Sequence, residues 1–197
     1  MKIAITGSIG SGKSLASTYL RSKGYKVYDT DKMVHAYYDI KGPAYETLIQ
    51  TFGQGILKED RTIDRGHLAS LVFQDKDKLN QLESVVYPIL VKEIQSLDDA
   101  NEIIFYEVPV LYESGFETYF DKVLMIDADK DIRIERLLER GMSNEDLQRR
   151  MLNQMDPKIK VEKADDNIRN NSSIEDLHSA LDHYINQLEK EFDHGSI

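Results

Sequence analysis

Short runs of hydrophobic residues recur along the chain, each bounded by polar or turn-forming residues. Such runs are typical of buried strands. We predict five strands, at residues 2–6, 25–28, 103–108, 123–126 and 167–170. Helical periodicity fills most of the intervals, and strands that alternate with helices are typical of an α/β fold with a mostly parallel sheet.

The intervals between the predicted strands are uneven. One helix, ended by Gly24, joins the first strand to the second. The much longer stretch 29–102 is mostly helical in pattern, so we expect a helical lobe inserted there. A second insertion, 130–166, contains two further helical patterns.

The composition narrows the class of protein. Of the 197 residues, 41% are hydrophobic and 30% charged, which excludes a mainly disordered chain. No apolar run approaches the ~18 residues of a membrane-spanning helix, and the opening residues lack the longer apolar stretch of a signal peptide. The absence of cysteine excludes disulfide frameworks and thiolate metal sites. We therefore expect a cytoplasmic protein with no membrane partner.

The charge balance bears on the ligand. A net charge of −10 has the wrong sign for a general nucleic-acid binder, so we expect no nucleic-acid partner. An anionic small molecule would need a local basic site inside this acidic envelope. The stretch 130–163 has more basic than acidic residues, unlike the rest of the chain.

One segment matches a phosphate-binding pattern at every required position. Residues 7–14 have the form G-x-x-x-x-G-K-[ST] and lie between a predicted strand and a predicted helix. The glycines let backbone N–H groups curl around phosphate oxygens, and the helix N-terminus adds positive partial charge. Lys13 is expected to reach the outer phosphates, and Ser14 to ligate Mg²⁺. Ser8 and Ser11 either line the loop or only form its turn.

Two carboxylates, Asp29 and Asp31, follow the second predicted strand. Ligands of open α/β sheets bind beyond the carboxyl ends of the strands. Either acid can orient an acceptor hydroxyl or accept its proton, and either can instead cap the helix that begins near Lys32. Spacing alone does not rank them. The guanine-reading motif Asn-Lys-x-Asp is absent from the sequence, which favours a small kinase over a GTPase.

The phosphate loop followed by Asp29-Thr30-Asp31 resembles the dephospho-CoA kinase family. Further segments fit the family pattern in order and spacing, up to about residue 171: 52–57, 63–73, 82–88, 108–113, Arg136, Arg140, Arg150, Gln154, 164–165 and Asn170. The resemblance implies a P-loop kinase fold, in which a five-stranded parallel sheet flanked by helices carries a helical acceptor lobe and a helical lid. It implies transfer of the γ-phosphate of ATP to the 3′-hydroxyl of dephospho-CoA. The alternative is another small-molecule kinase, of the nucleoside or nucleoside monophosphate type.

The resemblance also implies how the chain is organised. We expect a single kinase domain with a core at 1–30, 98–129 and 164–197, an acceptor lobe at about 31–97 and a lid at about 130–163. Its partners would be ATP and dephospho-CoA, with Mg²⁺ as the metal. The chain is expected to be a monomer or a weak homo-oligomer.

Candidate site residues follow from the motif and the resemblance. Asp31 would orient or deprotonate the acceptor hydroxyl, while Lys13 and Arg140 would stabilise charge on the transferring phosphoryl group. The nucleotide-binding candidates are Ser8, Ile9, Gly10, Ser11, Gly12, Lys13, Ser14, Leu15, Arg140 and Asn170. Ser14 and Glu107 are the candidates for Mg²⁺; Glu107 ends the third predicted strand, and the alternative is a strand-end carboxylate in solvent.

Three arginines, at positions 133, 136 and 140, share one face of a predicted helix. They form either a solvated face or part of a lid that brings guanidinium groups to the phosphates of ATP, with Arg150 as a second phosphate contact. The resemblance favours the lid.

Other charged residues also have two interpretations. Glu113 either contacts the acceptor or marks the start of a helix. Lys158, Lys160 and Lys163 form a basic trio that could help the lid, although such lysines usually only keep a surface soluble.

Four positions depart from the family pattern. Ser8 stands where glycine is frequent, Leu15 where threonine is usual, and Thr30 where alanine is usual. Tyr87 stands where a histidine often precedes Pro88. None of these changes removes a group that phosphoryl transfer needs.

Overall fold

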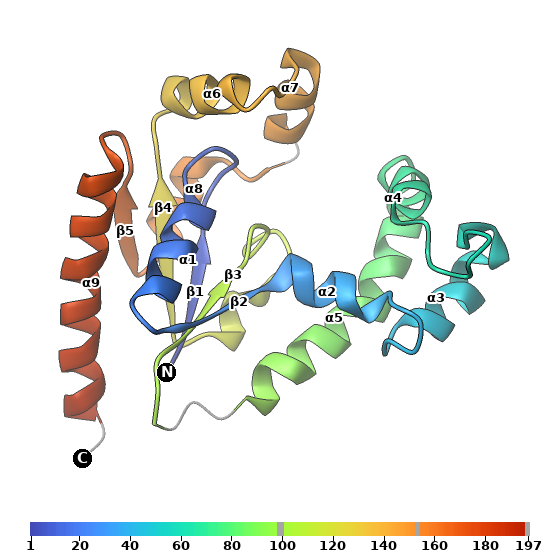
Figure 1. Ribbon diagram of the computed structural model, residues 1–197, viewed down its shortest axis with the longest axis horizontal. Coiled ribbons are helices and arrows are strands. Elements are labelled where there is room, and N and C mark those ends of the chain that lie inside the picture. The colour runs from blue at the N-terminus through green and yellow to red at the C-terminus, as the bar shows by residue number, and fades with distance from the viewer. Residues whose placement is uncertain (98–100, 153, 196–197) are drawn as a thin grey trace. The chain divides into compact units, whose positions relative to one another are not determined.

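A five-stranded parallel sheet organises the fold, and the computed structural model describes residues 1–97, 101–152 and 154–195. The spatial order of the strands is β2-β3-β1-β4-β5 (Figure 1). Their bounds are β1 Lys2–Thr6, β2 Lys26–Asp29, β3 Ile104–Glu107, β4 Lys122–Asp127 and β5 Asp166–Arg169. All five predicted strands are confirmed, but β2 starts one residue later than predicted and β5 one residue earlier. Asn170 therefore lies just after β5 rather than within it.

The central strand, β1, is covered on both faces. Ile3 pairs in register with Phe105 of β3, and Ile5 pairs with Leu124 of β4. These residues belong to the hydrophobic core, and Ala4 between them is also fully buried. A strand buried on both faces needs a continuous apolar run, which is the pattern that the sequence shows.

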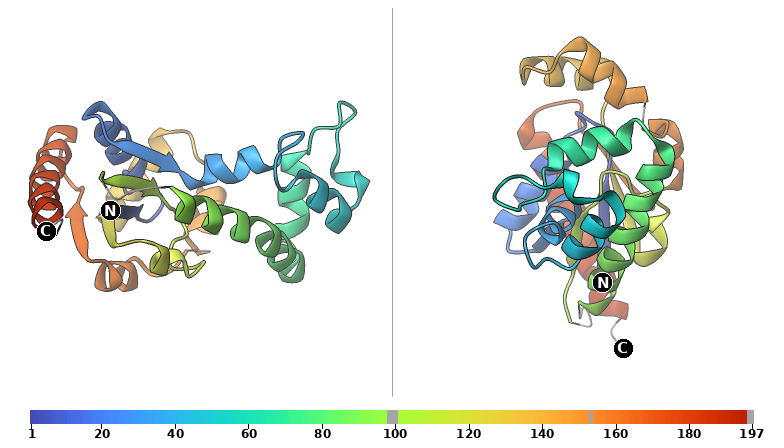
Figure 2. Two further views of the ribbon diagram at one scale, coloured as in Figure 1. Left: turned by 90° about the horizontal axis from the view of Figure 1, so that it is seen from below. Right: turned by 90° about the vertical axis from the view of Figure 1, so that its right-hand side faces the viewer.

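The chain divides into two compact units, one comprising Met1–Tyr28 and Asp99–Ile197 and the other Asp29–Asp98. The helices of the first unit are α1 Lys13–Ser22, α6 Lys130–Glu139, α7 Asn144–Leu152, α8 Pro157–Lys163 and α9 Ile174–Gly195, with a 3₁₀ turn, η2, at Phe116–Tyr119. Helices α1 and α9 pack on each other and close the core over the sheet, while α8 contacts β4. Helices α6 and α7 lie beyond the carboxyl ends of β1 and β4, as Figure 1 and the right-hand view of Figure 2 show.

The second unit is helical, as its periodicity predicts. It contains α2 Thr30–Tyr37, α3 Tyr45–Phe52, α4 Arg65–Phe73 and α5 Lys76–Ser96, with a 3₁₀ turn, η1, at Gln54–Ile56. Helices α2, α3 and α4 each pack against α5. The hydroxyl of Tyr37 donates to Glu93 of α5 at 2.5 Å, and that of Tyr87 donates to Glu83 one turn earlier on α5 at 2.9 Å.

The predicted bounds of core, acceptor lobe and lid stay predictions, although α8, at the end of the predicted lid, contacts β4. Across the described ranges, none of the helices has both the length and the apolar character needed to cross a membrane.

Candidate active site

The loop between β1 and α1 curls tightly around two glycines. Gly10 has φ 82° and Gly12 has φ 101°, a backbone region that side chains rarely adopt. A Cβ atom on Gly10 would lie 2.8 Å from the carbonyl oxygen of Arg133, and one on Gly12 would lie 2.3 Å from Nδ2 of Asn170. Both glycines are therefore required by backbone conformation and by the close approach of neighbouring segments.

Polar contacts hold this loop, one between its own residues and one from the segment after β5. The N–H of Ser11 donates to the carbonyl of Ser8 at 3.1 Å, so Ser8 forms a turn. The hydroxyls of Ser8 and Ser11 are buried and have no partner among the described residues. The buried Asn170 donates from Nδ2 to the carbonyl of Ser11 at 2.8 Å. Asn170 therefore supports the loop, and its predicted contact with nucleotide stays a prediction.

Lys13 and Ser14 open helix α1 with two polar contacts. The ammonium of Lys13 donates to the carbonyl of Gly7 at 2.8 Å. The hydroxyl of Ser14 donates to Oε1 of Glu107, at the end of β3, at 2.7 Å. Glu107 is only 6% exposed, which rules out the alternative of a strand-end carboxylate in solvent.

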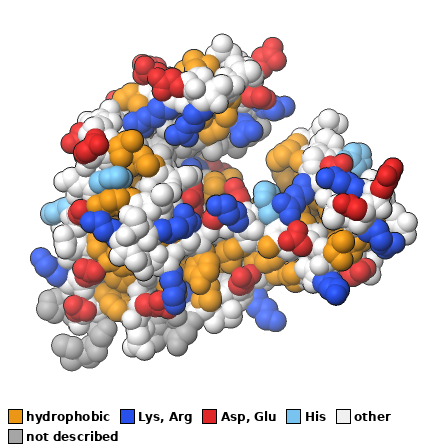
Figure 3. Space-filling model, in the orientation of Figure 1, with side chains coloured by type: hydrophobic (Ala, Val, Ile, Leu, Met, Phe, Trp, Pro, Cys, Tyr) orange, Lys and Arg blue, Asp and Glu red, His pale blue; other side chains and the backbone are white. Residues whose placement is uncertain are grey.

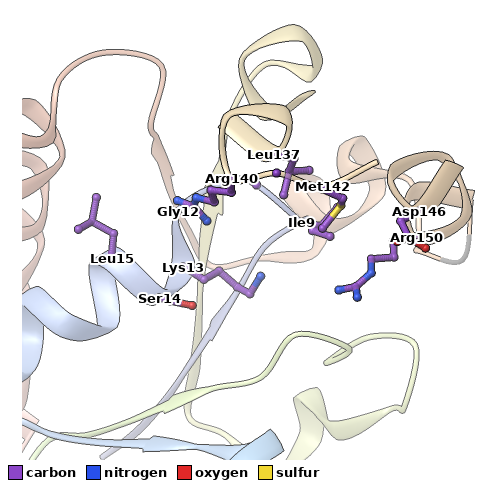
Figure 4. A pocket seen from close by; sticks show the side chains of 12 residues that line it. Ile9, Gly12, Lys13, Ser14, Leu15, Leu137, Arg140, Met142, Asp146 and Arg150 are labelled. Atoms are coloured by element: carbon purple, nitrogen blue, oxygen red, sulfur yellow. The ribbon is translucent and has the colours of Figure 1, made fainter. Parts of the chain in front are cut away.

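A cavity of about 440 Å³ lies beside the loop (Figure 4). Its lining residues from the loop and α1 are Ile9, Gly10, Gly12, Lys13, Ser14 and Leu15, and those from the α6–α7 segment are Leu137, Arg140, Gly141, Met142, Asp146 and Arg150. In Figure 4 the side chains of Lys13 and Arg150 extend into this space from opposite sides. A volume of this size suits a small-molecule ligand.

A second space, of about 380 Å³, adjoins the first. Gly12, Leu15 and Arg140 line both, and Arg136 and Asn170 line the second. The two spaces together run along the loop from Arg150 to the segment after β5. Most of the predicted nucleotide-binding residues thus line one or the other of these two neighbouring spaces.

The arginines of the predicted lid occupy different environments. Arg133 is 5% exposed; its Nε donates to the carbonyl of Ala128 at 3.1 Å, and burial lowers the pKa of its guanidinium. Arg133 therefore does not join Arg136 and Arg140 at the cavities. Nη1 of Arg136 is buried with no partner within the described residues, so an acceptor from a ligand would satisfy it. Figure 3 shows that Lys and Arg side chains gather beneath α6 and α7.

Glu113, which is partly exposed, forms an ion pair with the fully buried Lys160, and neither sequence interpretation anticipated this pair. Nζ of Lys160 lies 2.6 Å from Oε1 of Glu113, and the lysine side chain is 0% exposed. The expectation of an exposed, solubilising lysine is thus wrong for Lys160. Glu113 serves this lysine because α8 packs against β4 and brings the two together.

Asp29 and Asp31 have different surroundings in the second unit. The side chain of Asp29 is the N-cap of α2: it accepts from the N–H of Lys32 at 3.2 Å and pairs with the ammonium of that lysine at 3.0 Å. Asp31 lies in the first turn of α2. Burial raises the pKa of the nearby Tyr38 hydroxyl to about 12, an effect that Arg65 opposes and Asp31 reinforces. Asp29 is therefore the capping residue, which leaves Asp31 as the candidate for the acceptor hydroxyl.

Mg²⁺ would find a partial set of ligands at the loop. Within the parts of the chain that the structure describes, no group of three or more His, Cys, Asp or Glu residues could hold a metal ion. Mg²⁺ often takes only one or two protein oxygens and completes its shell with water and substrate phosphates. The paired oxygens of Ser14 and Glu107 fit that pattern.

Sequence reasoning named Gln154 only as part of a family pattern, yet this residue touches the phosphate loop. Its Oε1 accepts a hydrogen bond from the N–H of Ile9 at 2.9 Å. The two residues are 145 positions apart. No local signal in the sequence could have indicated the contact.

The chain is similar to known proteins along nearly its whole length. The family model described as dephospho-CoA kinase matches residues 1–176. The dephospho-CoA kinase of Fusobacterium nucleatum is 36% identical over 95% of this chain and 98% of its own length, and that of Aquifex aeolicus is 37% identical over 96% and 98%. The structure of the dephospho-CoA kinase from Campylobacter jejuni superposes with a TM-score of 0.72 at 30% identity, covering 97% of this chain and 99% of that one. These matches favour the main prediction over a nucleoside or nucleoside monophosphate kinase, and the chain belongs to the dephospho-CoA kinase family.

Proposed function

We propose that this chain transfers the γ-phosphate of ATP to the 3′-hydroxyl of dephospho-CoA, with Mg²⁺ bound at Ser14 and Glu107. The observation that carries the proposal is the family match over residues 1–176, joined to an intact phosphate loop. The cavity beside that loop is lined by cationic side chains, as an anionic triphosphate requires.

The loop and the arginines supply positive charge from two sides. The transferring phosphoryl group carries charge on its peripheral oxygens in the transition state, so catalysis depends on positioning and on electrostatic stabilisation. In this proposal Lys13 leaves the carbonyl of Gly7 for the outer phosphates. Arg140, which borders both cavities, and Arg150 meet the phosphates from the α6–α7 side. Bound Mg²⁺ would neutralise further phosphate charge.

Asp31 acts on the acceptor. The carboxylate orients the 3′-hydroxyl for in-line attack and accepts its proton as the phosphoryl group transfers. Asp29 is held by its capping and ionic contacts to Lys32, which supports this choice. A cavity of about 330 Å³ in the same unit, lined in part by Tyr38, Lys58 and Arg65, is a candidate region for another part of the acceptor.

The direct test is a reaction with ATP, Mg²⁺ and dephospho-CoA, followed by mass detection of products. Formation of coenzyme A and ADP in equal amounts is expected. Parallel reactions contain nucleosides or nucleoside monophosphates in place of dephospho-CoA. Phosphorylation of one of these acceptors, with none of dephospho-CoA, would replace the proposal by the alternative kinase.

Lys13→Ala is expected to lower turnover by at least about 10²–10³-fold, the usual loss when one preorganised hydrogen-bond donor to developing charge is removed. The fold should persist because Lys13 borders the cavity rather than the core. Steady-state kinetics and thermal unfolding measure the two effects. Lys23→Ala, at the other end of α1 and paired with Asp182, is the matched control and should keep its turnover. Near-normal turnover of Lys13→Ala would contradict the phosphate-loop role.

Arg140→Ala is expected to reduce kcat more than it reduces the midpoint of thermal unfolding, because Arg140 is an exposed residue at the C-terminal end of α6 and lines both cavities. Arg140→Lys should recover only part of the activity, since an ammonium cannot make two-pronged contacts with phosphate. Arg149→Ala on α7, which removes an exposed pair with Asp146, serves as control. A large stability loss with intact kinetics would make Arg140 a structural residue instead.

A further inference from the structure

The N–H of Ile9 donates a hydrogen bond to a side chain of the first unit that lies far away in the sequence. Ile9 belongs to the phosphate loop and lines its cavity. Its N–H donates to Oε1 of Gln154 at 2.9 Å. A loop that binds phosphate through its N–H groups depends on where its backbone is held. Gln154 is thus in a position to fix where the backbone of the first half of the loop lies.

The residue that follows Gln154 is itself anchored. The N–H of Met155 donates to Oε1 of Glu113 at 3.0 Å. The same carboxylate oxygen lies 2.6 Å from Nζ of the fully buried Lys160, and Nζ also approaches the carbonyl of Pro109 at 3.5 Å. The backbone at 154–155 is therefore fixed to the segment after β3 by a charge pair that water does not screen on its lysine side.

In the sequence, Gln154 follows α7 by two positions. This helix ends at Leu152, and its Arg150 lines the cavity beside Ile9. Gln154 consequently lies where three parts of the site meet: the phosphate loop, the arginine-bearing helix and the anchored segment after β3. A small shift of the Gln154 side chain would move the loop relative to Arg150.

We propose that Gln154 is a positioning residue for phosphoryl transfer, a role that deepens the proposed kinase function and rests on it. Its side-chain carbonyl accepts from the N–H of Ile9, and the N–H of the next residue donates to Glu113, which pairs with Lys160. These contacts together hold the loop to the segment after β3. The loop then presents Lys13 and its N–H groups to the γ-phosphate in one geometry. Gln154 acts through Ile9 and does not need to touch the substrate.

Gln154→Met tests the role because it keeps the side-chain length and removes the acceptor. We expect kcat to fall about tenfold or more, since small misplacements of reacting groups cost up to about 10²-fold. ATP affinity, measured by direct titration, should change no more than a few-fold, and the midpoint of thermal unfolding should stay close to that of the parent protein. Gln148→Met on α7, an exposed glutamine, is the matched control and should behave as the parent.

Gln154→Glu tests whether the effect of a substitution comes from the lost hydrogen bond or from any change of this side chain. A carboxylate still accepts from the N–H of Ile9 but adds negative charge beside the triphosphate. We expect kcat at saturating ATP to recover well above that of Gln154→Met, with a KM for ATP several-fold higher than in the parent. A glutamate variant no better in kcat than the methionine variant would overturn the proposal, as would a Gln154→Met variant with kcat within twofold of the control.

A third measurement needs neither acceptor nor turnover. Hydrogen exchange at the amide of Ile9, followed by NMR in the free protein, should be about tenfold faster in Gln154→Met than in the parent and in Gln148→Met. If the parent fails to phosphorylate dephospho-CoA, the proposed function fails, while exchange at Ile9 still reports on the contact. Unchanged exchange at Ile9 would remove the physical basis of the positioning role.

Discussion

Asp31→Asn is expected to lower the turnover of dephospho-CoA by about 10²–10⁴-fold, the usual contribution of a general base. Asparagine keeps the size and most of the hydrogen bonding of aspartate but cannot accept the proton. ATP affinity should stay nearly unchanged, because in our proposal ATP is held by the phosphate loop and the arginines. Steady-state kinetics with dephospho-CoA and a direct titration with ATP measure the two quantities.

Asp29→Asn is the matched control, because Asp29 caps α2 while Asp31 is the proposed base. Asparagine caps helices as well as aspartate does, so the contact to the N–H of Lys32 can persist. Turnover of this variant should remain within a few-fold of the parent. If Asp29→Asn is inactive and Asp31→Asn active, the two roles are exchanged. If both variants keep their activity, neither acid is the base, and Glu107 becomes the next candidate.

The parts of the fold that local sequence determines were predictable. The strand positions follow from apolar runs, and the phosphate loop follows from a motif whose glycines the backbone requires. The boundary that mattered most was missed by two residues: α2 begins at Thr30 rather than near Lys32. That shift makes Asp29 the N-cap, and spacing alone could not decide between the two acids because either one can cap a helix that starts a residue later.

The residues whose surroundings were misjudged are those that lie against segments far away in the sequence. Arg133 follows the helical pattern of an exposed face, but α6 packs so close to the loop that a Cβ on Gly10 would clash with its carbonyl. Lys160 belongs to a basic trio in the sequence, yet it is buried against Glu113. Periodicity reports which residues share a face of a helix. It does not report which face the rest of the fold covers, and so the contact between Gln154 and Ile9 also had no sequence signal.

Glu113→Gln is expected to destabilise the fold by at most about 3–5 kcal/mol, the result of removing one partner of an ion pair buried on both sides, because here Lys160 is fully buried and Glu113 is 21% exposed. The physical reason is desolvation: Lys160 is 0% exposed, so its ammonium loses its counter-charge without gaining water. For a chain of this size, that loss corresponds to a fall of about 6–20 °C in the midpoint of thermal unfolding. Glu102→Gln is a matched control, because Glu102 pairs with Lys26 at the same 2.6 Å distance but this lysine is exposed, unlike Lys160. Its midpoint should barely change.

Replacing both partners of this ion pair distinguishes the effect of the buried charge from that of side-chain packing. Lys160→Met removes the buried ammonium and keeps a side chain of similar length, so it should rescue much of the stability that Glu113→Gln loses. Thermal or urea unfolding of the two single variants and the double variant gives the coupling between the two positions. A double variant as unstable as the sum of the single variants would show that the two residues do not interact. Rescue of stability would identify desolvation of Lys160 as the cause. The same carboxylate accepts from the N–H of Met155. A double variant that regains stability but turns over slowly would therefore show that a folded first unit is not sufficient. Holding the 154–155 backbone would then depend on the charge of Glu113 as well.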